Sequence, residues 1–343
     1  MVANTGLVVV GIDNGGTKNN ATILDASGRF LIDRMHEVPS RVKEGPEAAI
    51  EAMVASMDVV LGASGIERAR VAAVGLDTPG PASPDGVISS MGATNFAQPA
   101  WRGFDVRAGL EARIGLPVVY NNDGNAAALY AHHVHFGKRS PLTASVSAVV
   151  GTGLGGGVIE AGRVIRGASG QAGELGHIQI PLDGILADDQ PIPTCACGLA
   201  SDVESVASLT GIVRNLLPYW LTKHPGHPLC AMPLADAAKS VRSYGEAGDE
   251  LARSLFEQQA AAIGRLFSIA ANFTDPNAYF VGGGVVEAEP VFRDWFLERV
   301  RAHTDLREEQ AAVAEFALVP DLDMAGARGS AFAALALLAL ENG

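Results

Sequence analysis

The stretch VVVGIDNGGTKNNATILD, residues 8–25, decides the fold of this chain. Two short runs rich in β-branched residues flank a turn that contains Asp13, Gly15 and Gly16, and this pattern predicts two antiparallel strands. Because one strand follows another here, Asp13 does not cap a helix, and we expect its carboxylate to face a ligand. Glycines in a turn let a ligand approach the backbone closely, and that ligand is often a phosphate. Glycine hairpins are also common without a ligand, so the rest of the chain must decide.

The composition of the chain excludes several classes of protein. Hydrophobic residues make up 48% of the 343 residues, which is enough for a substantial core and favours about two domains. The net charge of −13 would repel a nucleic acid, so we expect no nucleic-acid partner. Three cysteines argue against a disulfide scaffold, and no basic leader precedes the first strand. The longest apolar run, residues 331–340, is shorter than the roughly 20 residues of a membrane helix. We expect a cytoplasmic protein with no membrane partner.

The order of the predicted elements indicates an α/β protein with two similar halves. The sequence predicts a third strand over residues 28–38, a helix over 46–65, a buried strand over 70–80, and a strand followed by a helix over 116–137. Residues 144–167 repeat the order of strand, glycine turn, strand and hairpin that opens the chain. Such a repeat suggests a duplicated fold with a cleft between the halves.

Asp123 has two interpretations on sequence grounds. It lies between a predicted strand and a helix that starts near Gly124, where an aspartate commonly caps the helix. Alternatively, Asn122 and Asp123 form a polar pair at the end of a buried strand, where open α/β sheets bind ligands. A carboxylate at such a place accepts the proton of a substrate hydroxyl that attacks a phosphoryl group. Both interpretations stay open at this point.

A second polar group follows in the segment of residues 173–204. Cys195 and Cys197 form a Cys-x-Cys-Gly turn, which together with His177 is a plausible zinc knuckle, although the two cysteines alone are also compatible with buried thiols. Ser201 and Glu204 have the spacing of a capping box at the start of the next helix. The same spacing therefore predicts a purely structural role for Glu204.

Taken together, these motifs resemble the ROK family (repressor, ORF, kinase). The matching motifs, in family order over about residues 8–332, are GIDNGGTK, GLDTPGPASPDG, TNFAQPAW, LPVVYNNDGNAAAL, VVGTGLGGGVI, GELGH, CACG followed by Glu204, and VGGGVV. The resemblance implies a two-domain actin-like (ribonuclease H-like) ATPase fold of the α/β class with an interdomain cleft. It implies a small α/β domain over residues 1–121, on which a C-terminal helix of about 326–343 packs back. Residues 122–325 are then a large α/β domain that carries the zinc loop.

The same resemblance implies an activity and a set of site residues. The activity is the ATP-dependent phosphorylation of a hexose, first of all of glucose to glucose 6-phosphate, in a homodimer that uses magnesium. The general base is Asp123, and the sugar-contacting positions match Asn95, Asn122, Asp123, Glu174, His177 and Glu204. The phosphate- and nucleotide-binding positions match Asp13, Gly15, Gly16, Thr17, Lys18, Gly151, Thr152, Gly153, Gly155, Gly282, Gly283 and Gly284.

The chain departs from the family pattern at its zinc signature. Where the family has a third cysteine, this chain has Asp202, and Cys230 is too far along the chain to replace it. Because a carboxylate also ligates zinc, we expect a structural zinc site of His177, Cys195, Cys197 and Asp202. A zinc-free loop held by packing is the alternative.

Other functions compete with a glucose kinase. One is a sugar-responsive regulator or a sensor without catalysis. Against these, the first hairpin starts near residue 11, where we expect no DNA-binding domain ahead of it, and the chain retains Asp13 and Asp123. A kinase for an N-acetylhexosamine or another hexose, or one that uses polyphosphate in place of ATP, also stays open.

Overall fold

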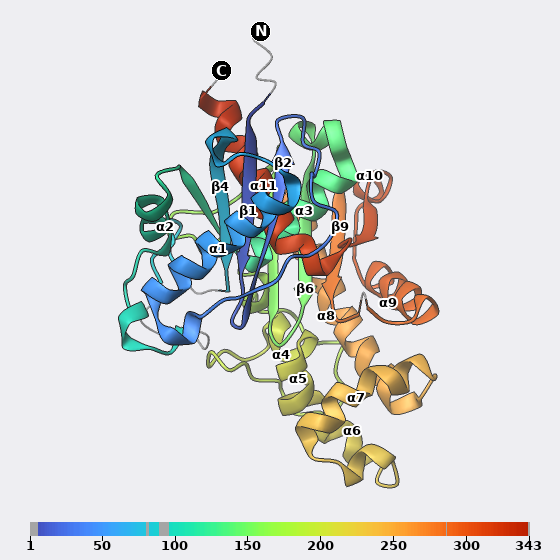
Figure 1. Cartoon of the computed structure of the whole chain (residues 1–343). Coiled ribbons are helices and arrows are strands. Elements are labelled where there is room, and N and C mark those ends of the chain that lie inside the picture. Colours follow the sequence, from blue (N-terminus) through green and yellow to red (C-terminus); the bar gives the residue numbers. More distant parts are fainter. Residues whose placement is uncertain (1–5, 80–81, 89–95, 286, 342–343) are drawn as a thin grey trace. The chain divides into compact units, whose positions relative to one another are not determined.

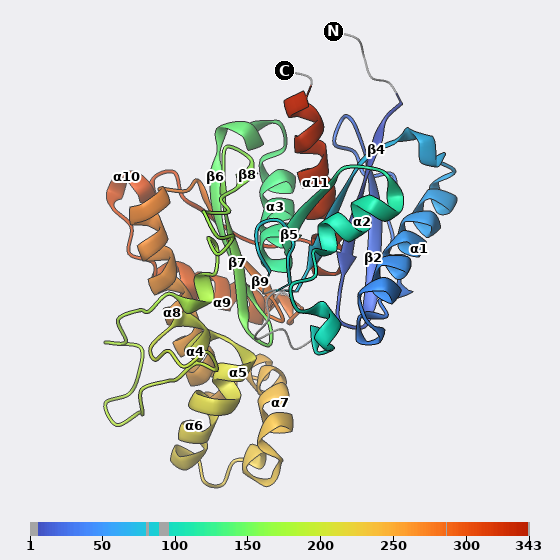
Figure 2. The same ribbon diagram turned by 90° about the vertical axis from the view of Figure 1, so that its left-hand side faces the viewer.

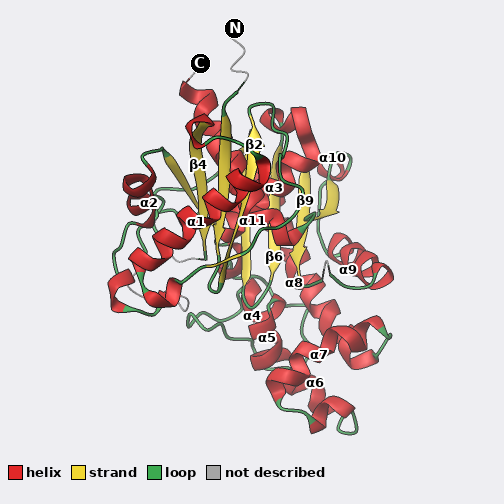
Figure 3. Ribbon diagram, in the orientation of Figure 1, coloured by secondary structure: helices red, strands yellow, loops and turns green. Residues whose placement is uncertain are grey.

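The computed structural model describes residues 6–79, 82–88, 96–285 and 287–341 (Figure 1). The chain divides into two compact units. Unit 1 comprises residues 1–142, 157–173 and 320–343, and unit 2 comprises residues 143–156 and 174–319. Two five-stranded sheets form the framework (Figure 3). Within the described residues, no helix is long and apolar enough to cross a membrane.

The first sheet belongs to unit 1 and has the strand order β3-β2-β1-β4-β5. β1 is antiparallel to β2 and parallel to β4, and β4 is parallel to β5. The carboxyl ends of β1, β4 and β5 therefore meet at one edge of this sheet. The strands are β1 (Val8–Asn14), β2 (Lys18–Asp25), β3 (Val38–Pro39), β4 (Val71–Thr78) and β5 (Val118–Asn122).

Helices cover both faces of the first sheet, as Figure 2 shows. They are α1 (Pro46–Ser64), α2 (Val106–Ile114), α3 (Asp123–Phe136) and α11 (Leu322–Glu341). Alternate residues of β1 point to opposite faces, so Val8, Val10 and Ile12 join α1 in one hydrophobic core. The opposite face of β1 and β4 packs against α11, which also packs against α3.

Glycines allow the C-terminal helix α11 to lie directly on the sheet. A Cβ atom at Gly11 would stand 1.9 Å from the carbonyl oxygen of Ala327, and one at Gly75 would stand 1.8 Å from that of Ser330. On the other side of α11, a Cβ at Gly329 would stand 1.8 Å from the Ala126 carbonyl oxygen of α3. No side chain fits at these three positions, so the backbones themselves form the contact.

The second sheet has the strand order β10-β9-β6-β7-β8. Its strands are β6 (Ala144–Val150), β7 (Leu154–Glu160), β8 (Arg163–Val164), β9 (Ala278–Gly283) and β10 (Glu315–Leu318). The central helix of unit 2 is α8, which is buried along most of its length and packs against α4, α7 and α9. The helices of unit 2 are α4 (Val203–Ala207), α5 (Leu209–Gly211), α6 (Leu217–Lys223), α7 (Leu234–Glu246), α8 (Glu250–Thr274), α9 (Pro290–Ala302) and α10 (Glu308–Ala311).

The structure confirms most of the predicted elements but not the third strand. Both glycine hairpins, the helix that ends at Gly65 and the apolar C-terminal helix are present. The prediction of one strand over residues 28–38 is wrong. Only an isolated bridge between Phe30 and Leu24 and the two-residue strand β3 pair with β2 in this region. Residues 33–35 are all exposed, so this segment lacks the alternation that would bury one face of a strand. The domain boundary near residue 121 stays a prediction.

Candidate functional site

The turn between β1 and β2 is the hairpin that the opening stretch predicts. The Gly15 amide donates a hydrogen bond to the Lys18 carbonyl oxygen at 3.0 Å, which closes the turn. Gly16 is half-buried and Thr17 is exposed at the tip. The Lys18 ammonium forms an exposed ion pair with Glu37. Because exposed ion pairs contribute little stability, Lys18 can exchange this partner for another anion.

Asp13, at the end of β1, lies beside a carboxyl group that the sequence analysis missed, Asp77. The two residues are register partners in the parallel pair of β1 and β4. Asp77 is 0% exposed, and its Oδ2 accepts a hydrogen bond from Ser330 Oγ of α11 at 2.8 Å. The sequence shows only that Asp77 lies near the end of a predicted buried strand; its pairing with Asp13 depends on the order of the strands in the sheet.

Burial changes the protonation of this carboxyl pair. It raises the pKa of Asp77 well above its ordinary value, and the charge of Asp13 raises it further. Burial also raises the pKa of Asp13 to about 6. The charge of Asp123 adds to this increase, and a hydrogen bond with Asp77 acts against it. The two neighbouring carboxyl groups therefore each favour the protonated form more than an ordinary aspartate does.

The structure separates the roles of Asn122 and Asp123 at the carboxyl end of β5. Asn122 caps α3, because its Oδ1 accepts a hydrogen bond from the Asn125 amide at 2.7 Å. The N-cap interpretation of Asp123 is therefore wrong. Asp123 Oδ1 accepts a hydrogen bond from the Gly124 amide at 2.8 Å, and its side chain is open to solvent. Burial of the carboxyl group raises its pKa, and the backbone hydrogen bond from Gly124 acts in the opposite direction.

In unit 2, the second glycine turn (residues 151–155) is fixed by the segment around α5. The Gly151 amide donates to the Gly153 carbonyl oxygen at 2.9 Å, and the Thr210 amide donates to the Thr152 carbonyl oxygen at 3.0 Å. A Cβ atom at Gly153 would stand 2.5 Å from Glu204 Oε2, so the Glu204 carboxylate would have to shift to make room for a side chain there. The same Glu204 oxygen accepts the amide hydrogen of Leu154 at 2.9 Å.

The third glycine turn (residues 282–284) meets the second one at the end of β6. The Gly284 amide donates to the Val150 carbonyl oxygen at 3.0 Å. Gly283 has a φ of +97°, and a Cβ there would stand 1.8 Å from the same oxygen, so only glycine fits. Val150 directly precedes the second turn, and the two predicted nucleotide-binding turns of unit 2 are therefore neighbours.

Unit 2 also brings together the four predicted zinc ligands. His177 Nδ1 lies 3.3 Å from Asp202 Oδ2, 3.9 Å from Cys195 Sγ and 3.7 Å from Cys197 Sγ. Cys197 Sγ lies 3.8 Å from Asp202 Oδ2. Bonds to zinc of about 2.3 Å for sulfur and 2.0–2.2 Å for nitrogen or oxygen place tetrahedral ligand atoms about 3.3–3.8 Å apart. The donor set and its spacing therefore fit a zinc ion.

Asp202 has a second role that corrects the predicted capping box. Its Oδ1 accepts the Ser205 amide hydrogen at 2.9 Å, so Asp202 caps α4, while Ser201 has a left-handed φ of 63°. Glu204 does not return to the start of its helix. Its Oε1 accepts a hydrogen bond from the Cys195 thiol at 3.3 Å. The carboxylate of Glu204 thus joins the Cys195 loop to the second glycine turn.

The long segment between His177 and Cys195 is anchored on α8. Gln258 of α8 donates through Nε2 to the Ile185 carbonyl oxygen at 3.0 Å and to Gln190 Oε1 at 2.6 Å. Both glutamines are buried, so this pair holds the segment in place without a metal. Asn95, predicted to contact the sugar, lies outside the described residues.

Comparison with known sequences identifies the family. The sequence model of the ROK family matches residues 9–337. The chain belongs to the ROK family. This membership, together with the two mixed sheets, confirms the predicted α/β class and actin-like ATPase fold.

Individual members of the ROK family resemble this chain over most of its length. The glucokinase of Halalkalibacterium halodurans is 30% identical over 86% of this chain and 84% of its own. An N-acetyl-D-glucosamine kinase of Escherichia coli O6:H1 is 30% identical over 94% of this chain and 97% of its own. A ROK glucokinase of Streptomyces griseus, solved with glucose and AMPPNP, has 28% identity and a TM-score of 0.66, and the match covers 95% of this chain and 99% of that one.

Proposed function

We propose that this protein is an ATP-dependent hexokinase that converts glucose to glucose 6-phosphate. The observation that carries the proposal is the similarity to glucokinases over more than four fifths of the chain. The structure supports it with a carboxylate, Asp123, at the carboxyl end of a parallel strand, where α/β sheets bind their ligands. We also propose, from the family resemblance alone, that the protein is a cytoplasmic homodimer.

In this proposal Asp123 is the general base. Because Asn122 caps α3, the Asp123 carboxylate is not needed for that purpose, and it faces solvent where a sugar can reach it. Its raised pKa makes it a better proton acceptor than an ordinary aspartate. It takes the proton of the sugar hydroxyl as that oxygen attacks the terminal phosphoryl group of ATP.

The glycine turns are the proposed phosphate and nucleotide sites. The backbone amides of these turns can donate hydrogen bonds to phosphate oxygens, so the turns bind phosphate without charged side chains. Asp13 is the proposed residue for magnesium, since a carboxylate flanked by other carboxyl groups suits a cation that prefers oxygen ligands. Magnesium bound with ATP neutralises charge on the transferred phosphoryl group.

Sugar recognition is assigned to Asn122, Glu174, His177 and Glu204, with Asn95 as a further candidate. The hydrogen bond that Glu204 accepts from the Leu154 amide indicates that it also positions the second glycine turn. A substitution of Glu204 is therefore expected to affect both sugar and nucleotide binding.

An N-acetyl-D-glucosamine kinase is the second candidate, because the E. coli relative with this activity matches more of the chain than the glucokinase does. A panel of hexoses and N-acetylhexosamines, with ATP or polyphosphate as donor, separates the candidates by kcat/KM. We expect the highest value for glucose with ATP. A higher value for N-acetyl-D-glucosamine would transfer the assignment to the second candidate.

We further propose one structural zinc ion per chain, held by His177 Nδ1, two thiolates and Asp202 Oδ2. With Nδ1 on the metal, the ring orientation of His177 is fixed and its Nε2 stays available for a sugar hydroxyl. Because burial raises the pKa of the Cys195 thiol, zinc must displace a tightly held proton, so zinc affinity should fall as the pH decreases.

Asp202→Asn tests the fourth ligand. The substitution keeps an oxygen for the helix cap at Ser205 and replaces Oδ2 by an amide nitrogen that does not ligate zinc. We expect elemental analysis to find about one zinc per wild-type chain and at least tenfold weaker zinc retention against a chelator in the variant. Cys230→Ser, which removes an exposed thiol outside the cluster, is the matched control and should retain zinc. Wild-type protein without zinc would contradict the proposal.

A further inference from the structure

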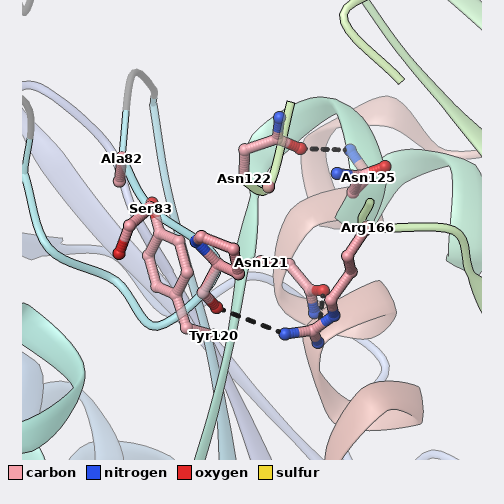
Figure 4. Close-up of a pocket in the computed structure, with 9 residues that line it drawn as sticks. Ala82, Ser83, Tyr120, Asn121, Asn122, Asn125 and Arg166 are labelled. Carbon is pink, nitrogen blue, oxygen red and sulfur yellow. Dashed lines mark hydrogen bonds between the residues drawn. The ribbon is translucent and has the colours of Figure 1, made fainter. Parts of the chain in front are cut away.

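A small pocket of unit 1 includes Asn122, a proposed sugar ligand, and extends to residues that the proposed chemistry does not use (Figure 4). Its wall includes polar side chains from the end of β5, the start of α3 and the loop after β8. The residues that matter here are Pro84, Asn121, Asn122, Asn125, Arg166 and Gly170.

Arg166 brings a positive charge into this pocket without an ion-pair partner. Its Nη2 donates to Asn121 Oδ1 at 3.0 Å, and its Nη1 lies 3.5 Å from the Pro84 carbonyl oxygen. Among the described residues, no carboxylate oxygen lies within ion-pair distance of its guanidinium, although the charge of Asp85 acts on it from farther away. The guanidinium is half-buried and stays protonated, so one charge is left without a counter-ion.

Asn121 adds a donor with no partner. Arginine only donates, so the Asn121 oxygen must face Arg166, and this fixes the orientation of the amide. Its Nδ2 group is then turned away from Arg166. Asn121 is 3% exposed, and Nδ2 has no hydrogen-bond acceptor among the described residues. A buried N–H group without an acceptor is unusual in a folded protein, and a ligand that accepts a hydrogen bond would satisfy it.

Asn125 presents a second unmatched amide at the same wall. It is 4% exposed, and its assigned oxygen has no donor among the described residues. Turned over, the same amide would offer its NH₂ group to a ligand. Elsewhere on the wall, a Cβ atom at Gly170 would stand 2.7 Å from the Pro84 nitrogen, so the two loops that carry these residues are in contact.

We propose that this pocket binds a small oxyanion or a carboxylate. Such a ligand neutralises Arg166 and accepts hydrogen bonds from both the guanidinium and the Asn121 amide. A water molecule would satisfy the amide but leave the charge without a counter-ion, and a cation would be repelled. The anion is either free in solution or carried by a sugar held at Asn122, and the second source rests on the proposed kinase function.

Titration calorimetry of the full chain with phosphate, sulfate and acetate, at constant ionic strength, tests the free anion. We expect saturable binding with millimolar dissociation constants and mutual competition. Arg166→Gln should weaken it at least tenfold, whereas Arg163→Gln, which removes an exposed charge from the same hairpin, should leave it unchanged. Equal binding by the Arg166→Gln variant would overturn a site at this pocket.

Asn121→Asp is the sharper variant, because it changes charge and not shape. The new carboxylate would stand where Oδ1 now accepts from Arg166, and the resulting ion pair would act as a built-in counter-ion. Anion binding should be lost while the melting temperature is unchanged or higher. Retained binding in a folded Asn121→Asp protein would contradict the proposal.

A charged sugar distinguishes the two sources. N-acetylmuramic acid carries a carboxylate on a lactyl ether and keeps its 6-hydroxyl, and N-acetyl-D-glucosamine is its uncharged parent. If the sugar supplies the anion, the acid binds more tightly than the parent in the wild type but not in Arg166→Gln. If the anion is free, only the inorganic ions and acetate show this dependence on Arg166. If neither ligand depends on Arg166, the pocket is not an anion site, whatever the outcome for kinase activity.

Discussion

Asp123→Asn should lower kcat by about 10²–10⁴, the range that general-base catalysis typically contributes. Asparagine keeps the size of the side chain and its hydrogen bond with the Gly124 amide, but it accepts no proton. Because Asn122 caps α3, the substitution should leave the melting temperature nearly unchanged. Steady-state kinetics and thermal unfolding of the same preparation measure the two effects separately.

The pH dependence of the activity provides a second test of Asp123 as the general base. The base is active when ionised, and burial raises the pKa of Asp123. The value of kcat/KM should therefore fall, as the pH decreases, at a pH above the ordinary range of aspartate, and this limb should be absent from the residual activity of the asparagine variant. Normal turnover together with a lowered melting temperature would instead assign Asp123 a structural role.

Gly75→Ala is expected to have the largest effect on stability. The added Cβ would stand 1.8 Å from the Ser330 carbonyl oxygen, which belongs to the backbone of α11 and has no flexible end to move away. Overpacking of a well-packed core costs about 1–3 kcal/mol, and a clash with a helix backbone belongs at or above the upper end. Chemical denaturation should therefore show a marked loss in the free energy of unfolding.

Gly62→Ala is the matched control for this loss. Gly62 is an exposed residue within α1, and a Cβ there meets no atom within 4 Å. The change should raise the free energy of unfolding by about 0.4–1 kcal/mol, because alanine restricts the unfolded chain. If Gly75→Ala were as stable as the Gly62→Ala variant, the close packing of α11 on the sheet would be contradicted.

The sequence predicted those features that depend on local chemistry. The hairpin at Asp13 and the glycine turn before Leu154 follow from residue types at short spacing. The cluster around His177 needed the family resemblance as well, which named Asp202 as the fourth ligand. The prediction of the third strand was wrong because the polar part of this segment can pair with the sheet or leave it at little cost in free energy. Only the tertiary structure decides between the two.

Features that depend on long-range pairing could not be predicted from one sequence. Asp77 becomes a partner of Asp13 only through the register of β1 and β4, and of Ser330 only through the packing of α11. Likewise, the unpaired charge of Arg166 is evident only when the loop after β8 is placed against Asn121. The cap of α4 was assigned to the wrong neighbour, and one of the two open interpretations of Asp123 made the same error at α3, because adjacent polar residues compete for the same amide groups.

The most direct test of the central claim is ADP release by the purified protein with ATP, magnesium and glucose, followed by identification of the sugar product. The account predicts ADP formation that saturates with glucose and yields glucose 6-phosphate in equal amount. It also predicts that the Asp123→Asn variant loses both products together. The assignment as a sugar kinase would be contradicted if the wild-type protein is folded and binds nucleotide but no sugar in the panel stimulates ADP release.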